Sequence, residues 1–187
     1  SANPFRHVIV VDKGSTDGVY NGQAIVDAEG VVGQVIDVGV ASSQCLLISD
    51  PGHDLPVEVN RNGLRTIARG TGEFSSLDFP FLPNNADIEP GDLLVTSGLG
   101  GAFPAGYPVA VVDTVTINPQ EPFASVTAIP SAALNQMREV MLIWSGPTDT
   151  PDESPQESSA DNDDAATDSE VETPADAESA DEETSDE

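Results

Sequence analysis

One segment rich in glycine and proline restricts the fold of this chain more than any other. It runs from Thr96 to Val109 and reads Thr-Ser-Gly-Leu-Gly-Gly-Ala-Phe-Pro-Ala-Gly-Tyr-Pro-Val. Glycine suits backbone with positive φ or a close approach of two chain segments, and proline fixes φ and lacks an amide donor. We therefore expect a structural crossover between two strands that carries aromatic side chains. No Lys-Ser or Lys-Thr follows Gly101, so the segment is not a phosphate-binding loop.

The rest of the pattern predicts a chain that is nearly all β. Short runs rich in Val, Ile, Leu and Phe alternate with clusters of Gly, Pro, Asn and Asp, which is typical of strands and turns. Strands are expected at Val8–Val11, Gln23–Val26, Val31–Val38, Gln44–Ile48, Leu55–Val59, Thr66–Arg69, Leu77–Leu82, Asp92–Thr96, Pro108–Ile117, Ala124–Ile129 and Val140–Trp144. A hairpin turn is expected at Asn62-Gly63. Only Pro130–Arg138, with Ser131 as N-cap, has the composition of a short helix.

The strands fall into two similar sets, which predicts two small β-barrel subdomains. Each set has a strand after a Gly-polar pair, a turn, a long strand, a second turn and a further strand, once between residues 21 and 48 and again between 90 and 129. Short strands without covering helices must close or stack to hide their edges. We expect the first barrel at residues 5–82 and the second at 83–146. The strand at 8–13 is an alternative member of the second barrel.

The charge of the chain is concentrated at its C-terminal end. Residues 147–187 hold 17 of the 33 Asp and Glu and none of the Lys, Arg or His, and Val171 is their only branched apolar residue. Because such a segment cannot bury enough surface to offset chain entropy, we expect a disordered acidic C-terminal tail. Two interpretations stay open for it: a solvating, self-repelling tail, or an attractor for a basic partner. The net charge of −27 argues against binding of nucleic acid or anionic membranes.

The chain does not begin with Met, and its first residues enter a strand pattern at once. Its longest apolar run, Val140–Trp144, is far too short to span a membrane. We therefore expect an excised fragment whose anchor or targeting segment would lie upstream.

Few residues suit catalysis or metal binding. His7 and His53 are the only histidines and show no zinc spacing with Cys45, so we expect no metal and no cofactor. The neighbours of Cys45 are apolar, which favours a buried structural thiol. The segment Asp12–Gly18 lacks the ligand pattern of a calcium loop and predicts a tight turn. His53, Ser97 and an Asp would form a hydrolytic triad only if the fold brought them together.

Apolar side chains in the connections are the remaining candidates for function. Phe79, Phe81, Phe103 and Tyr107 lie in or beside proline-rich connections, and Leu99 lies between the glycines of the crossover segment. Aromatic side chains in such loops supply large, rigid contact area to a partner. Core packing is the alternative, and the sequence does not separate the two. These five residues are the candidates for partner binding.

Several motifs, taken in their order, resemble the MreC family of rod shape-determining proteins. They are Val11–Val26, Gly30–Val35, Leu46–Pro51, Gly91–Gly101, Phe103–Val109 and Arg138–Ile143. The resemblance covers Phe5 to Trp144 and leaves the acidic tail outside. It implies two barrels distantly similar to the trypsin-like barrel, without a protease triad. It also implies a periplasmic location, with a membrane helix and a coiled coil upstream.

The resemblance implies a non-enzymatic scaffold of the cell-elongation machinery, the elongasome, that maintains rod shape. Proteins of this family bind the elongation-specific penicillin-binding transpeptidase and connect through MreD and RodA to MreB filaments. They also self-associate as dimers or filaments. Two alternatives stay open: a hydrolase of the trypsin-like barrel type, and a purely structural self-assembling module.

Overall fold

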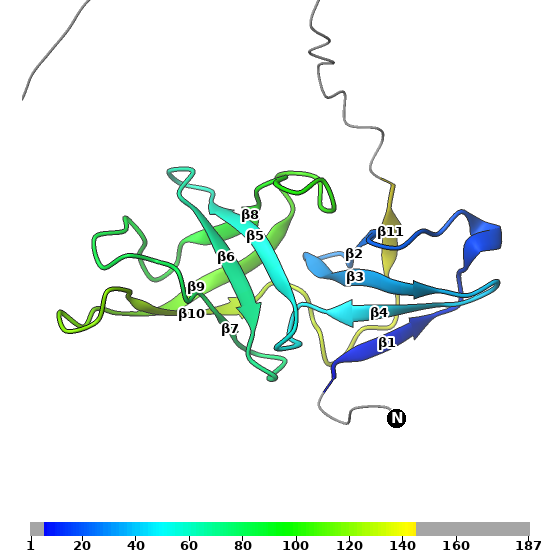
Figure 1. The fold of residues 1–187 in the computed structure, drawn as a ribbon, viewed down its shortest axis with the longest axis horizontal. Coiled ribbons are helices and arrows are strands. Elements are labelled where there is room, and N and C mark those ends of the chain that lie inside the picture. Colours follow the sequence, from blue (N-terminus) through cyan, green and yellow to red (C-terminus); the bar gives the residue numbers. More distant parts are fainter. Residues whose placement is uncertain (1–5, 145–187) are drawn as a thin grey trace, which may run out of the picture. The chain divides into compact units, whose positions relative to one another are not determined.

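The computed structural model describes residues 6–144, which form a five-stranded sheet and a closed barrel (Figure 1). The sheet has the strand order β1-β4-β3-β2-β11. Its strands are β1 (Val8–Val11), β2 (Ala24–Val26), β3 (Val31–Val38), β4 (Ser43–Leu47) and β11 (Met141–Ile143). A single 3-10 turn, η1 (Ser15–Asp17), follows β1. Figure 1 shows β11 beside β2, although the two are far apart in the sequence.

The barrel has six strands in the order β10-β7-β6-β5-β8-β9, and β9 pairs with β10 to close it. Its strands are β5 (Asp54–Val59), β6 (Arg65–Gly70), β7 (Leu77–Asp78), β8 (Leu93–Thr96), β9 (Pro108–Thr116) and β10 (Ser125–Pro130). Every neighbouring pair is antiparallel. Closure gives each strand two partners, so the barrel has no free edge.

The prediction of an all-β chain is confirmed, and each of the predicted runs overlaps an observed strand. In β5 the alternation works as expected, because Leu55, Val57 and Val59 are buried while the residues between them are more exposed. The β5–β6 hairpin turns at Gly63 with φ 72°, and the Leu64 amide donates to Oδ1 of Asn62 over 3.0 Å.

The expected boundary between residues 82 and 83 falls inside the closed barrel and does not separate it from the sheet. All strands from β5 to β10, at residues 54–130, belong to the closed barrel. The strand expected at 8–13 pairs with β4 in the other sheet. That sheet is open, with β1 and β11 at its edges, so one barrel is closed where two were expected. The predicted acidic tail at 147–187 lies outside the described residues.

The prediction of a helix at Pro130–Arg138 is wrong. Pro130 ends β10, and the residues after it form turns in which the Leu134 amide donates to the Ala132 carbonyl over 3.0 Å. Both of these side chains are buried in the core. An isolated short helix must offset a costly nucleation step, and here core contacts favour the turns instead. Within residues 6–144, no helix has the length and apolar character that crossing a membrane requires.

A tight junction joins β4 of the sheet to β5 of the barrel. The buried Asp50 carboxylate accepts the backbone amides of His7 over 2.7 Å and Gly52 over 2.8 Å, and its carbonyl accepts the His53 amide over 2.9 Å. Gly70, at the end of β6, packs against this turn so closely that an added Cβ would lie 2.1 Å from the Asp50 carbonyl oxygen. One continuous hydrophobic core runs through both parts.

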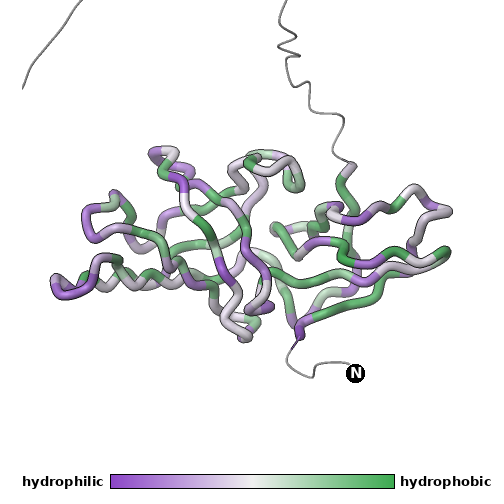
Figure 2. The backbone as a smooth tube through the Cα atoms, viewed as in Figure 1, coloured by the Kyte–Doolittle hydropathy of each residue, from purple (hydrophilic) through white to green (hydrophobic). Residues whose placement is uncertain are grey.

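Hydropathy along the backbone follows the fold (Figure 2). The tips of the β5–β6 and β9–β10 hairpins are hydrophilic, as expected for solvated turns, whereas β1 is hydrophobic over its whole length. Nevertheless, β1 is an edge strand, and Val10 within it is 69% exposed. An apolar edge strand of this kind is unusual, because exposed edges are normally protected by charges, proline or a covering segment.

Candidate partner-binding surface

The crossover segment is a loop between β8 and β9 whose base is fixed by the buried Thr96. The Thr96 hydroxyl accepts the Tyr107 amide over 2.9 Å and donates to the Pro104 carbonyl. The Thr96 amide donates to the Tyr107 carbonyl, and the Thr96 carbonyl accepts the Gly106 amide, both over 2.8 Å. The two ends of the loop are therefore held together by a buried hydrogen-bond network, as expected of a structural crossover.

Glycine is required at the turns of this loop. Gly98 has φ 76°, and a Cβ there would lie 3.1 Å from the Cβ of Ala105. Gly100 and Gly101 also have positive φ, at 79° and 70°. L side chains rarely adopt this region, so the three glycines set the path of the loop.

Two of the five candidate residues lie in the core. Phe79 is fully buried, and its amide donates to the Val126 carbonyl over 3.2 Å. Phe103 is 5% exposed and meets the His53 ring edge to face, with ring centroids 6.1 Å apart. Phe103 thus anchors the crossover loop to the junction before β5. Neither side chain is accessible to a partner in this structure.

Phe81 is accessible, at 51% exposure, and lies beside an ion pair. The Arg69 guanidinium lies 5.6 Å from the centre of the Phe81 ring, which is a cation–π arrangement. Arg69 also makes a two-pronged bond to Asp54, with Nε to Oδ1 at 2.7 Å and Nη2 to Oδ2 at 2.9 Å. This bond lowers the pKa of Asp54 and raises that of Arg69. The guanidinium is held in place, and so is the ring against it.

The crossover loop lies at the same end of β5. The Ser97 amide donates to the Pro56 carbonyl over 3.2 Å, so the loop leaves β8 beside the start of β5. Leu99 follows and is 49% exposed, whereas Tyr107 is half-buried against the core. Phe81 lies on the β6 side of β5 and the loop on the β8 side. We call Phe81, Leu99 and Tyr107 the loop-end surface.

Sequence reasoning missed Arg69 and Asp54, which fix one side of the loop-end surface. A partial signal for their pairing was present, because Asp54 and Arg69 lie on either side of the predicted hairpin turn at Asn62-Gly63, eight and six positions away. Antiparallel strands that leave one turn bring opposite charges near each other across the pair, and in the observed register Asp54 and Arg69 are partners. The placement of Phe81 beside them had no such signal, because it depends on how the chain turns after β7.

The structure does not assemble a hydrolytic triad. His53 is 4% exposed, and within the described residues neither ring nitrogen has a hydrogen-bond partner. Burial lowers the pKa of His53 to about 4, against the opposing effect of the Asp54 and Asp50 carboxylates. The Ser97 hydroxyl accepts the Leu99 amide over 3.4 Å instead. A triad requires hydrogen bonds from serine to histidine and from histidine to a carboxylate, and residues 6–144 contain neither for His53.

Cys45 is buried and free, as its apolar neighbours predicted, and burial raises its pKa to about 11. The segment predicted as a tight turn also forms one, since the Asp17 carboxylate accepts the Gly14 amide over 3.1 Å and bonds Lys13 over 3.2 Å. The Gly14 amide is the main cause that lowers the pKa of Asp17. No group of three or more His, Cys, Asp or Glu suited to a metal ion occurs in the part of the chain that the structure describes.

Comparison with known proteins identifies the family. The family model for rod shape-determining protein MreC, barrel core, matches residues 1–144. The chain belongs to the MreC family. The cell shape-determining protein MreC of Escherichia coli K12 is 48% identical over 142 residues, which cover 76% of this chain and 39% of that protein. The chain therefore spans about two fifths of the length of the curated relatives it matches.

Solved structures agree with this assignment. The crystal structure of MreC from Pseudomonas aeruginosa is 49% identical, has a TM-score of 0.73, and the match covers 77% of this chain and 93% of that one. A more distant similarity, at 24% identity and a TM-score of 0.53, is to a structure of a complex between penicillin-binding protein PBP2 and MreC from Helicobacter pylori. That match covers 64% of this chain and 74% of the other, and at this identity it shows a shared fold.

Proposed function

We propose that this chain is the periplasmic part of a non-enzymatic scaffold of cell elongation, and that it binds the elongation-specific penicillin-binding transpeptidase. Membership of a family of rod shape-determining proteins supports the scaffold role. The Helicobacter pylori relative, which forms a complex with PBP2, supports the choice of partner. An anchor in the inner membrane, upstream of these residues, belongs to the same proposal.

The observation that carries the proposal is the loop-end surface. Leu99 and Phe81 are each about half exposed and project from segments held by buried hydrogen bonds, a core aromatic anchor and an ion pair. Apolar side chains on preorganised segments bind a partner with little loss of conformational entropy. Phe79 and Phe103 serve this surface indirectly, because they hold its segments against the core.

Binding at this surface acts by selection among conformations of the transpeptidase. A scaffold that holds one conformation more tightly than another shifts the population toward it by its difference in affinity. In this proposal the transpeptidase catalyses the reaction, and the scaffold only binds it. In the same proposal, the scaffold connects through MreD and RodA to MreB filaments, and self-association raises the effective concentration of binding sites along the membrane.

The test is calorimetric titration of this chain with the periplasmic part of the cognate transpeptidase. Leu99→Ala and Phe81→Ala each remove an exposed apolar side chain, and we expect each to weaken binding roughly tenfold, as for truncated interface anchors. Ile117→Ala is the matched control. Ile117 is 58% exposed but follows the opposite end of β9, so its removal should leave the affinity unchanged.

If all three variants bound with the affinity of the unsubstituted chain, the loop-end surface would be rejected as the binding site, and the partner would be kept. Absence of binding by the unsubstituted chain would reject the partner proposal for residues 6–144 and favour the self-assembling module. Circular dichroism of each variant checks that the fold is intact, which is expected because all three side chains are about half exposed.

A further inference from the structure

The five-stranded sheet has an odd number of strands, and this decides what can complete it. Its four pairings, β1 with β4, β4 with β3, β3 with β2 and β2 with β11, are all antiparallel. Four reversals leave β1 and β11 running in the same direction. They cannot pair with each other in an antiparallel ladder, whereas one more strand running opposite to both can pair with each. The neighbouring barrel, with six antiparallel strands, is closed.

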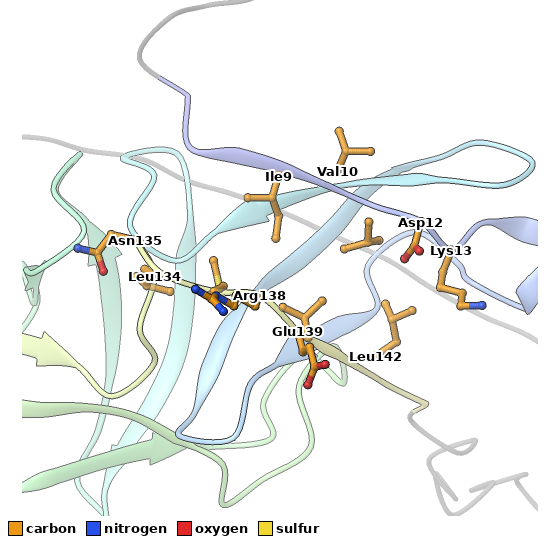
Figure 3. Close-up of a pocket in the computed structure, with 12 residues that line it drawn as sticks. Ile9, Val10, Asp12, Lys13, Leu134, Asn135, Arg138, Glu139 and Leu142 are labelled. Atoms are coloured by element: carbon orange, nitrogen blue, oxygen red, sulfur yellow. The ribbon is translucent and has the colours of Figure 1, made fainter.

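A groove lies where the sixth strand would fit. It has a volume of about 760 Å³ and runs between β1 and the segment that leads into β11. Figure 3 shows Ile9 of β1 on one side and Arg138 and Glu139 of that segment on the other. The apolar part of its lining comes from Ile9, Val10, Val11, Leu134, Met137, Val140 and Leu142.

The free edge of β1 faces this groove with backbone groups that have no partner within residues 6–144. The Leu47 amide of β4 donates to the His7 carbonyl over 2.9 Å, and His7 directly precedes β1 in an unbroken register. In an antiparallel pair, bonded positions alternate, so Ile9 and Val11 bond to β4. The amides and carbonyls of Val8 and Val10 therefore point to the free side. Such an edge is a template for a further strand.

We propose that this groove binds an extended segment of a partner protein, which adds as a sixth strand antiparallel to β1. The occupant must be free on both of its own edges to bond β1 and β11 together. A second copy of this chain offers only β1 and β11 as edge strands among its described residues, and one edge of each is already taken by its own sheet. Residues 145–187 contain Val171 as their only branched apolar residue and do not suit the groove.

The rim of the groove indicates the charge pattern of this segment. Within the described residues, Arg138 has no ion pair, and neither has Asp12 or Glu139. Lys13 is already paired with Asp17 at 3.2 Å. A complementary segment carries an acidic side chain for Arg138, a basic one for Asp12 or Glu139, and apolar side chains at alternate positions facing inward.

The first experiment selects binders to the 187-residue chain from a displayed library of random decapeptides. Enriched sequences should show alternating apolar residues over about six positions, the length that β1 and its flanking residues offer, with both signs of charge outside that run. A synthetic copy of one enriched peptide is then the probe. Enrichment without this alternation, or no enrichment, would overturn the proposal.

Edge variants of β1 test where the probe binds. Val10→Pro removes an amide on the free side only, which an edge strand tolerates, and should weaken binding tenfold or more. Val10→Thr keeps the amide and the β-branched shape, so its affinity should stay within about threefold. Unchanged binding to Val10→Pro would reject the site. Loss of a dimer by the same variant, seen in sedimentation, would assign the edge to a second copy instead.

Amide exchange on the unsubstituted chain decides the question even if Val10→Pro does not fold. The bound peptide should slow exchange at Val8 and Val10, whose amides have no partner among the described residues, and leave Ile9 and Val11 unchanged, since β4 already protects them. Protection confined to the barrel would place the peptide elsewhere and contradict the proposal.

Discussion

At the scale of single residues, His53 couples the folded state to pH. Its ring is buried with no hydrogen-bond partner among the described residues, and its pKa falls from the ordinary 6.5 to about 4. Between these two values the unfolded chain binds a proton that the folded chain does not. The free energy of unfolding therefore decreases as pH falls from 6.5 to 4, by up to about 3 kcal/mol. Above pH 6.5 the ring is neutral in both states, and His53 causes no such loss of stability.

Replacement of His53 by leucine should remove this dependence. Because the ring nitrogens make no hydrogen bond within residues 6–144, His53→Leu should leave the free energy of unfolding at pH 8 nearly unchanged. At pH 5 the free energy of unfolding of the variant should be about 2 kcal/mol higher than that of the unsubstituted chain. Urea unfolding at a series of pH values measures both. His7→Gln removes the other histidine and serves as control. Parallel pH profiles for His53→Leu and the unsubstituted chain would contradict the assignment.

Whether the burial of a side chain could be predicted from the sequence depended on whether the residue lies in a strand or in the turn after it. The run Leu77-Asp78-Phe79 alternates as a strand should, and Phe79 is indeed buried. The same alternation continues to Phe81, but β7 ends at Asp78 and the turn that follows directs Phe81 to the surface. Alternation predicts the burial of a side chain only within a strand, and the sequence does not show where β7 ends. The pattern therefore could not separate these two phenylalanines.

At the scale of elements, the β4–β5 junction depends on the absence of a side chain at Gly70. An added Cβ would lie 2.1 Å from the Asp50 carbonyl oxygen, and the backbone of this turn is held by the Asp50 carboxylate. Gly70→Ala should therefore lower the free energy of unfolding by about 2–3 kcal/mol, as overpacking does where the neighbours cannot move. Urea unfolding curves for the two chains measure this difference.

Gly63→Ala is the control for this prediction. Gly63 has open space around it and a φ of 72°, so alanine there costs only backbone strain, about 1 kcal/mol. If Gly70→Ala were no more destabilising than Gly63→Ala, the junction would be able to relax, and its rigid packing would be disproved.

Elements were predictable from sequence where the information is local. Short apolar runs bounded by turn residues gave each strand, because strand formation depends on neighbouring residues and their burial pattern. Pairing order is a property of distant segments. The return of β11 to β2 carries no local signal. The repeated strand pattern favoured a boundary between residues 82 and 83, where the barrel is in fact continuous. The turns at 131–138 were mistaken for a helix because composition alone favoured one.

At the scale of the whole molecule, charge opposes self-association. The formal net charge is −27, with only six basic residues to offset it. Salt screens repulsion between copies, since the Debye length shrinks from about 30 Å at 0.01 M to about 3 Å at 1 M ionic strength. Self-association should strengthen with ionic strength, as sedimentation velocity across this range would record. Association that weakens with salt would instead identify specific ion pairs as its basis.

The placement of β11 has a further consequence for how the chain folds during synthesis. The barrel strands occupy one uninterrupted stretch, residues 54–130, and can close as soon as that stretch has left the ribosome. The sheet, in contrast, contains β1, the earliest of the described strands, and receives β11, the latest of them. The pairing of β2 with β11 joins the two paired strands that are farthest apart in the described sequence, and such non-local contacts form slowly. One edge of β2 must therefore stay without its partner β11 until translation has passed residue 143.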